Sequence, residues 1–437
     1  MERERSHFIS MSNSSKLNQH ESGSSLPKLK GKTILFVGSY PPPYGGVSSL
    51  LAGLGKSFES VGCKYHVLHF YGKTEPSEKI DGAIVHRIKN KAVLPLLLSF
   101  FLKPIRTCRI ILVWLTHFIK SPNFFTSSIF LALNVSKIAD KVRAESVTIF
   151  TTRYGALIPF LRILNPCLPI YYCIFADPYK NPDFYDRYNH WFRKAMLSSN
   201  KVFSSSAYCA NAVRFFAPEL VPHYIYIGVD TKRFNPANDL VTSRSKIGIP
   251  QDKPVVLFVG RMEPEMGAGN AHEIAEKVIS RNKNIIFILA GAKGSLTKNI
   301  ESIADRNKGK IYCRVNVPFE DLPYYYNACT ILIAPTLGVH ACMGVTIKEA
   351  MASGKPTVVS DSGGIPEAIQ HGIEGEIVPL DKNGNIDNME FVKTIEVLLN
   401  DEARCKQYGY NARKRALEIF SLESTSEGYA KLLNGEI

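Results

Sequence analysis

The feature that most constrains the fold is a regular alternation of short β-branched runs with segments whose apolar residues recur at helical spacing. The first run, residues 33–37, ends at Gly38, and a loop rich in proline and glycine leads into a helical pattern over 47–59. The same rhythm starts again near residue 254. Strands that alternate with helices form parallel sheets with right-handed crossovers. The sequence therefore predicts two doubly wound α/β domains with a ligand cleft between them.

The alternation also assigns the individual elements. Strands are predicted at 33–37, 66–70, 83–88, 146–152, 169–176, 201–205 and 223–227, and then at 254–259, 284–290, 310–313, 330–334, 356–360 and 376–378. Helices of the second half are predicted near 269–281, 295–306, 319–327, 345–353, 364–370, 387–400 and 402–417. We expect an N-terminal domain over 31–234, a linker over 234–250, a C-terminal domain over 250–417, and a C-terminal segment, 418–437, that packs back on the N-terminal domain.

Residues 1–30 are polar and charged, so we expect a disordered tail that lacks the apolar core of a signal peptide. The nine cysteines are scattered without a C-x-x-C pair, which favours buried thiols in a reducing cytosol over a zinc site or a redox pair. We therefore expect a cytoplasmic protein.

The charge of the chain is unevenly distributed. Of the net +14, the whole excess lies in residues 1–230, which contain 28 Lys+Arg and 14 Asp+Glu, whereas the remainder is balanced. Such an asymmetry indicates an anionic partner for the first half. Phosphorylated lipid and a membrane surface fit better than nucleic acid, because the basic residues alternate with apolar runs and no nucleic-acid-binding motif occurs.

Two apolar runs, 92–102 and 110–119, are separated by Lys103, Arg106 and Arg109. Each is about half of the roughly 20 residues that a spanning helix needs, so no transmembrane helix is predicted. Basic residues at the borders of apolar runs are typical of an interfacial segment on anionic lipid. A pair of helices buried in the first domain is the alternative.

Three constellations indicate ligand chemistry. In the first, Gly45 and Gly46 follow the first strand and allow the backbone to approach a phosphate or sugar closely, while the helix that begins there supplies free N–H groups. The second is Gly260 and Arg261, which a strand delivers to the sheet edge, where a guanidinium can grip a diphosphate. The first loop lacks the G-x-G-x-x-G spacing, so no dinucleotide cofactor is predicted.

The third constellation lies where a helix begins after the strand 330–334. The N–H groups of Gly344, Val345 and Thr346 point out of the helix start and suit a phosphate. Glu349 lies near the end of the first turn and reaches back toward two ribose hydroxyls. The alternative for Glu349 is a charge that only stabilises the helix dipole.

These motifs resemble those of the family 4 retaining glycosyltransferases, which have the GT-B fold. The resemblance covers about 32–420 and is carried by three stretches of 225–380: Ile227-Gly228-Val229-Asp230-Thr231-Lys232-Arg233-Phe234, Glu349-Ala350-Met351-Ala352-Ser353-Gly354-Lys355-Pro356 and Ser362-Gly363-Gly364-Ile365-Pro366-Glu367. It implies two Rossmann-like domains facing a cleft and transfer of a sugar, with retention, from a nucleoside-diphosphate sugar. Arg261 and Glu349 would be the catalytic residues, and both would also bind the donor.

No clustered acidic motif of the D-x-D kind follows a strand, so the sequence signals no required metal. No cofactor is predicted, because the nucleoside-diphosphate sugar is a substrate. The basic, apolar first domain favours a lipid-linked or glycan acceptor at the cytoplasmic membrane face.

Three positions depart from the family pattern. Met266 stands where the family has a lysine, Ala341 stands where it has the first of two glutamates, and no histidine follows the fourth strand. His340 and Arg153 are candidates to replace the lost charges. The departures keep open a catalytically silent relative that binds nucleotide or a partner protein. A GT-B relative that isomerises or phosphorolyses sugars is a further alternative.

Overall fold

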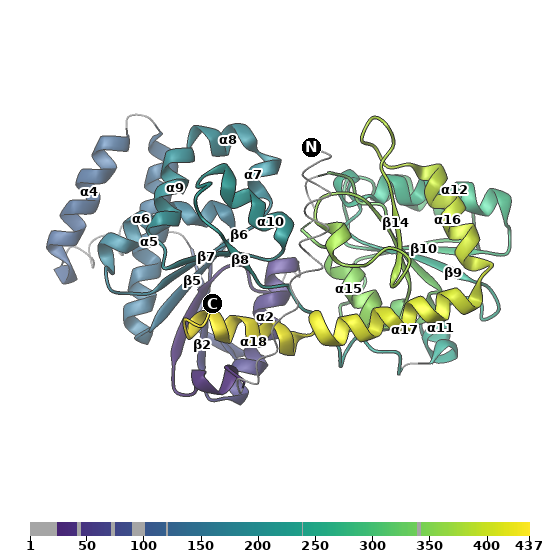
Figure 1. The fold of residues 1–437 in the computed structure, drawn as a ribbon, viewed down its shortest axis with the longest axis horizontal. Helices are drawn as coiled ribbons and strands as arrows, with labels where there is room; N and C mark the ends of the chain where they lie inside the picture. Colours follow the sequence, from purple (N-terminus) through teal and green to yellow (C-terminus); the bar gives the residue numbers. More distant parts are fainter. Residues whose placement is uncertain are drawn as a thin grey trace.

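In a computed structural model, the chain forms two α/β domains joined side by side (Figure 1). The structure describes residues 24–41, 45–70, 75–89, 101–118, 121–237, 239–338 and 342–437. Most of the expected tail, the apolar stretch 92–100, His340 and Ala341 lie outside these residues.

The N-terminal domain is built on an eight-stranded sheet in the order β3-β4-β2-β1-β5-β6-β7-β8. All neighbours pair in parallel except β3 and β4, an antiparallel edge that the alternation did not predict. The strands are β1 Thr33–Val37, β2 Lys64–Phe70, β3 Glu78–Ile80, β4 Ala83–Ile88, β5 Ser146–Phe150, β6 Ile170–Ile174, β7 Lys201–Ser204 and β8 His223–Tyr224. The central strands β1, β5 and β6 are buried along their whole length, as parallel strands covered on both faces must be.

Helices cover both faces of this sheet. The longer ones are α2 Gly46–Ser60, α4 Pro104–Phe118, α5 Pro122–Val142, α6 Ile158–Leu164 and α9 Asn189–Leu197, and the short ones are α7 Asp177–Lys180, α8 Pro182–Arg187 and α10 Ala207–Asn211. Helices α5, α6 and α9 enclose one core with the sheet, and α2 encloses the other. Helix α4 lies outside them, at the outer end of the domain (Figure 1).

The C-terminal domain has a six-stranded parallel sheet in the order β11-β10-β9-β12-β13-β14. Its strands are β9 Val255–Val259, β10 Ile286–Gly291, β11 Ile311–Val315, β12 Ile331–Ala334, β13 Thr357–Ser360 and β14 Gly375–Val378. Its helices are α11 Leu240–Ile247, α12 Ala268–Arg281, α13 Thr297–Arg306, α14 Leu322–Ala328, α15 Val345–Ala352, α16 Asn388–Leu399 and α17 Glu402–Ile419, with short 3₁₀ turns η4 Pro264–Met266 and η6 Ile365–Glu367. The predicted alternation of strands and helices is therefore confirmed for both domains.

The chain crosses back to the first domain at its end. Helix α18, Leu422–Leu433, continues from α17 beneath the N-terminal domain (Figure 1), where Tyr429 packs against Phe36 with ring centroids 5.8 Å apart. The sequence analysis assigned no helix to this segment.

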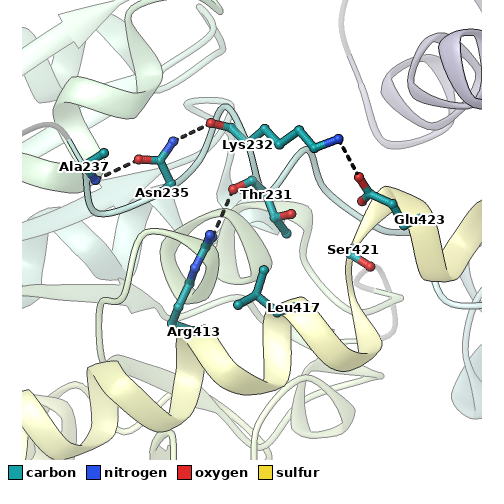
Figure 2. A pocket seen from close by; sticks show the side chains of 8 residues that line it. All are labelled: Thr231, Lys232, Asn235, Ala237, Arg413, Leu417, Ser421 and Glu423. Atoms are coloured by element: carbon teal, nitrogen blue, oxygen red, sulfur yellow. Dashed lines mark hydrogen bonds and ion pairs between the residues drawn. The ribbon is translucent and has the colours of Figure 1, made fainter.

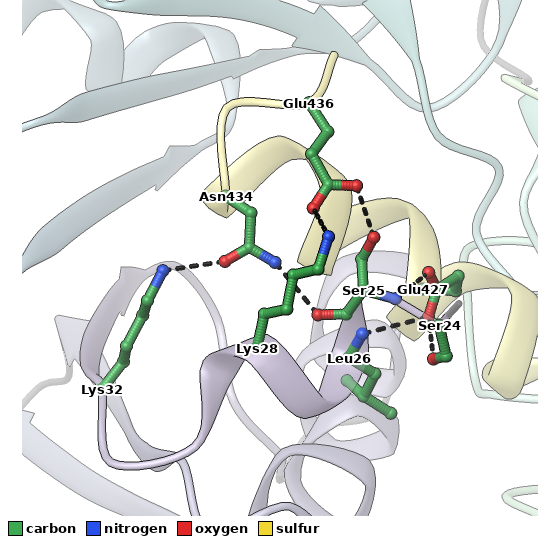
Figure 3. Close-up of polar contacts among 8 residues, drawn as sticks. All are labelled: Ser24, Ser25, Leu26, Lys28, Lys32, Glu427, Asn434 and Glu436. Atoms are coloured by element: carbon green, nitrogen blue, oxygen red, sulfur yellow. Dashed lines mark hydrogen bonds and ion pairs between the residues drawn. The ribbon is translucent and has the colours of Figure 1, made fainter. Parts of the chain in front are cut away.

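Residues 24–30, which the sequence assigned to the tail, are ordered against α18. Leu26–Leu29 forms the 3₁₀ turn η1, and Glu427 accepts hydrogen bonds from the backbone N–H groups of Ser25 and Leu26 at 2.6 and 3.2 Å (Figure 3). Two segments about 400 positions apart thus close the N-terminal domain together.

No helix among the described residues is both long enough and apolar enough to cross a bilayer.

Candidate functional site

Helix α2 begins at the carboxyl end of β1 with an uncapped first turn. Gly45 is its N-cap residue, has extended backbone and offers no side-chain hydrogen bond, and both Gly45 and Gly46 are exposed. The first N–H groups of the helix therefore face outward with the positive end of its dipole.

Helix α15 begins in the same manner in the C-terminal domain. Its N-cap, Gly344, has a φ of 67° and provides no side-chain cap for the N–H groups of Val345 and Thr346. This positive φ favours glycine, whereas the nearest atom to a Cβ there, Cδ1 of Ile347 at 2.8 Å, is the end of a side chain that can move.

The two helix starts meet across the domain boundary. A Cβ on Gly46 would lie 3.9 Å from Cγ2 of Val345, which is ordinary van der Waals contact. Each helix end carries roughly half a positive charge. The predicted glycine loop and the predicted phosphate-binding helix therefore form one electropositive edge, which suits an anion.

Arg261 lies at the adjacent strand end with its side chain exposed. It follows Gly260, whose carbonyl oxygen would lie 1.8 Å from a Cβ on Gly291, so β9 and β10 approach each other there as only glycine allows. Met266, at the end of η4, is half-buried and adds no charge where the family carries lysine.

The side chain of Glu349 is buried in the structure. Its side chain on α15 is 5% exposed, and Oε2 accepts a hydrogen bond of 2.6 Å from the hydroxyl of Tyr326 on α14. Burial raises the pKa of Glu349 to about 7, although the Tyr326 hydrogen bond and the charge of Lys348 act in the opposite direction. The carboxyl is thus held in place and poised to change charge near neutral pH.

The neighbouring residue, Lys348, has a role that the sequence analysis missed. Its Nζ donates a hydrogen bond of 2.5 Å to the carbonyl oxygen of Ile227 and so connects α15 to the segment that enters the linker. Burial lowers the pKa of Lys348 to about 8. The available signal was a lysine next to a glutamate in a helical stretch, Val345–Ala352, that is otherwise apolar except for Thr346.

A second missed residue is Glu367, which joins the domains. Its carboxylate, in η6 of the C-terminal domain, accepts hydrogen bonds from the N–H groups of Ala207 (2.9 Å) and Tyr208 (2.5 Å) at the start of α10 in the N-terminal domain. Such a carboxylate satisfies the free donors of a helix start. Gly364 in the same turn fits closely, because a Cβ there would lie 1.7 Å from the carbonyl oxygen of Cys342.

Arg153 and His340 are the two residues that the sequence offered as replacements for the lost charges. Arg153 is exposed, and its guanidinium lies 5.7 Å from the ring centre of Phe184, within the N-terminal domain. Thr151, two residues before Arg153 and directly after β5, has a φ of 81°, which is strained for a β-branched residue. His340 lies outside the described residues.

A pocket of about 550 Å³ opens beside the linker rather than at the helix starts (Figure 2). Its lining contains none of the predicted site residues and consists of Thr231, Lys232, Asn235, Ala237, Arg413, Leu417, Ser421 and Glu423. Arg413 donates hydrogen bonds to the carbonyl oxygens of Thr231, Phe234 and Ala352 at 3.1, 2.9 and 2.6 Å. This pocket therefore lies where the linker segment meets helix α17.

Within the ranges that the structure describes, no group of three or more His, Cys, Asp or Glu side chains is arranged to hold a metal ion.

Together, the two facing sheets and the paired helix starts define a two-domain protein of GT-B type. Sucrose-phosphate synthase from Thermosynechococcus elongatus has this fold, with a TM-score of 0.72 at 16% identity over 93% of this chain and 99% of that one. Anabaena HepE, solved in complex with UDP, gives a TM-score of 0.70 at 17% identity over 92% of this chain and 100% of that one.

Comparisons of the sequence with family models and with curated proteins point to the same class of protein. Residues 241–415 match the family model described as glycosyl transferases group 1. Alpha-maltose-1-phosphate synthase of Mycobacterium tuberculosis is 26% identical over 254 residues, 54% of this chain, and the match spans 65% of that relative, slightly less than two thirds of its length. Residues 241–415 thus match the group 1 glycosyl transferases, as the motifs predicted, and the whole chain has the GT-B fold. Membership of family 4 is compatible with these matches.

Proposed function

We propose that this protein is a retaining glycosyltransferase that moves a sugar from a nucleoside-diphosphate sugar to a lipid-linked or polysaccharide acceptor at the cytoplasmic face of a membrane. The observation that carries the proposal is the meeting of the α2 and α15 helix starts, with Gly46 in contact range of Val345. A diphosphate bound at this edge would be stabilised from both domains.

The donor site follows from the residues at this edge. The N–H groups of Gly344, Val345 and Thr346 bind the diphosphate, and Arg261 grips it in bidentate fashion from the end of β9. Glu349 holds the ribose through Oε1, because Oε2 accepts the hydrogen bond from Tyr326. HepE, which shares the fold, was solved with UDP, and this supports a uridine nucleotide as the first donor to test.

The reaction breaks the bond between the anomeric carbon and the diphosphate oxygen and forms one to an acceptor oxygen on the same face of the sugar. Negative charge grows on the departing diphosphate, so fixed donors at Arg261 and at the α15 start lower the barrier. The protein supplies no nucleophile in this scheme, and the departing group itself receives the acceptor proton. We assign no cofactor or metal to this step.

The acceptor assignment rests on charge and on the relatives. The first domain carries the whole basic excess of the chain, which suits an acceptor with a phosphate or diphosphate. Two similar proteins, a maltose-1-phosphate synthase and a sucrose-phosphate synthase, are named for phosphorylated products. We extend this chemistry to a phosphate that is carried by a lipid.

A catalytically silent relative is the second candidate, and Met266 favours it, because that residue removes a cation from the donor site. Such a protein would bind nucleotide, or a partner protein, without turnover.

A thermal-shift screen against UDP, GDP, ADP, CMP and their sugar conjugates tests the donor site, since a ligand that binds only the folded state raises the melting temperature. We expect a shift with one base, followed by release of the nucleoside diphosphate when a lipid-phosphate acceptor is added. Absence of a shift with every nucleotide would reject the donor site. A shift without product formation would favour the silent relative.

A further inference from the structure

Helix α4 is fixed to the N-terminal domain by its inner face. Lys103, just before the helix, forms an ion pair of 2.7 Å with Asp140, and Nη1 of Arg106 donates a hydrogen bond of 2.8 Å to the carbonyl oxygen of Leu164. Ile110 is fully buried against α5 and α6, and the indole N–H of Trp114 donates to Thr126 at 3.1 Å. The helix is therefore a rigid part of the domain, and its other face has a fixed direction.

That other face is apolar and open. On α4, Ile105, Leu112 and Leu115 recur at the spacing of one helix face, and their exposed fractions are 77, 64 and 52%. Phe101, just before the helix, is 83% exposed. Leu102 beside it is 74% exposed. We call these five residues the α4 stripe. Contiguous exposed apolar side chains of this kind mark a surface that contacts a partner or a membrane.

Charge identifies the partner. Asp81 and Asp140 are separated by 58 residues that contain no acidic side chain and eight Lys+Arg. Arg109 on α4 is exposed next to the stripe. The exposed charged side chains of α4 itself are cations, Arg106 and Arg109. This matches an anionic lipid surface, where acyl chains receive the apolar side chains and headgroups receive the cations.

The position of the helix supports the same partner. Helix α4 lies at the end of the molecule that is farthest from the C-terminal domain (Figure 1). A flat surface can therefore reach the stripe without displacing either domain or the donor edge.

We propose that helix α4 lies in the interface of an anionic bilayer, with the α4 stripe inserted at the acyl boundary, and that it holds the N-terminal domain on the surface that carries the acceptor. The lipid-linked acceptor rests on the proposed function, but the docking itself does not.

Flotation of the purified full chain with vesicles tests this docking. Vesicles of phosphatidylcholine with about one third phosphatidylglycerol should bind the chain, and raised salt should weaken the binding because exposed charges are screened. The double variant Ile105→Ser/Leu112→Ser should bind at least about tenfold more weakly, since it removes two inserted side chains. Arg109→Glu should lose preference for the anionic vesicles.

The matched control is Val221→Ser/Val397→Ser, which changes side chains that are 89 and 55% exposed and do not belong to the α4 stripe. It should bind vesicles as the wild type does, and melting temperatures show that all variants are folded.

Two results would overturn the proposal: no vesicle binding by the wild-type chain, or equal binding by the stripe variant. Self-association that the stripe variant abolishes, without vesicle binding, would assign the stripe to a second copy instead. Nucleotide binding is measured without lipid, so a failure of docking and a failure of the donor site are distinguishable.

Discussion

Replacing Glu349 by glutamine should make the protein more stable at alkaline pH. Burial raises the pKa of this carboxyl from an ordinary 4.5 to about 7. The folded state therefore binds the proton more tightly than the unfolded state, and the free energy of unfolding falls as pH rises from about 4.5 to about 7. At about 1.4 kcal/mol for each tenfold change in the ionisation constant, the loss reaches about 3 kcal/mol above pH 7.

Glutamine keeps the shape of the side chain and an oxygen that accepts the Tyr326 hydrogen bond, but it does not ionise. Glu349→Gln should therefore match the wild type near pH 4.5 and exceed its stability by up to about 3 kcal/mol at pH 8. Urea unfolding followed by circular dichroism between pH 4.5 and 8.5 measures this difference. Glu418→Gln, at an exposed position on α17, is the control and should leave the pH profile unchanged.

A stability difference that stays constant across this pH range would refute the reasoning, and so would a variant that is less stable at pH 8. The variant should also lose affinity for the nucleoside diphosphate, because Glu349 is proposed to hold the ribose. Gain of stability with loss of binding is the pattern of a residue kept for function.

Arg261→Ala should weaken nucleoside-diphosphate binding, measured by calorimetry, by about 1.5–3 kcal/mol, the scale of a charge-assisted hydrogen bond. The control Arg306→Ala, on α13, should leave the affinity unchanged. Unchanged affinity of the Arg261 variant for every nucleotide would remove Arg261 from the site. Glu367→Ala should free the start of α10 and separate the domains, and an unchanged radius of gyration by small-angle X-ray scattering would contradict this. Gly364→Ala should lower the melting temperature, because its Cβ would meet a backbone carbonyl at 1.7 Å. Gly269→Ala is its control, with a nearest contact of 3.6 Å, and equal melting temperatures would count against the tight fit.

The strands of both domains were predictable because their signal is local. β-Branched runs such as 255–259 are buried on both faces of a parallel sheet, so they are continuous in sequence. Gly260 follows one of these runs at the sheet edge, whereas Gly45 and Gly344 stand where helical patterns begin. These local signals are the basis for predicting a ligand site at the three glycines.

What the sequence did not reveal depends on partners far along the chain. Glu367 caps a helix 160 positions earlier, and Lys348 donates to a carbonyl 121 positions away, so no local pattern predicts either contact. Helix α18 was missed for a related reason, since it is stabilised by burial of Tyr429 in the other domain. The antiparallel strand β3 has only three residues and none is buried, so it carries too short a pattern to recognise.

The loss of the family lysine at Met266 does not remove the electrostatic basis of a diphosphate site. A helix start carries roughly half a positive charge, so the two starts that meet at Gly46 and Val345 together supply about as much as one lysine. These dipoles are fixed by backbone and need no side-chain ordering when the ligand binds, whereas a lysine has to immobilise a flexible chain. Their effect depends on domain closure, since the α2 start belongs to one domain and the α15 start to the other. The Glu367 contact with α10 joins the same two domains. We therefore expect it to favour the closed arrangement on which donor binding would depend.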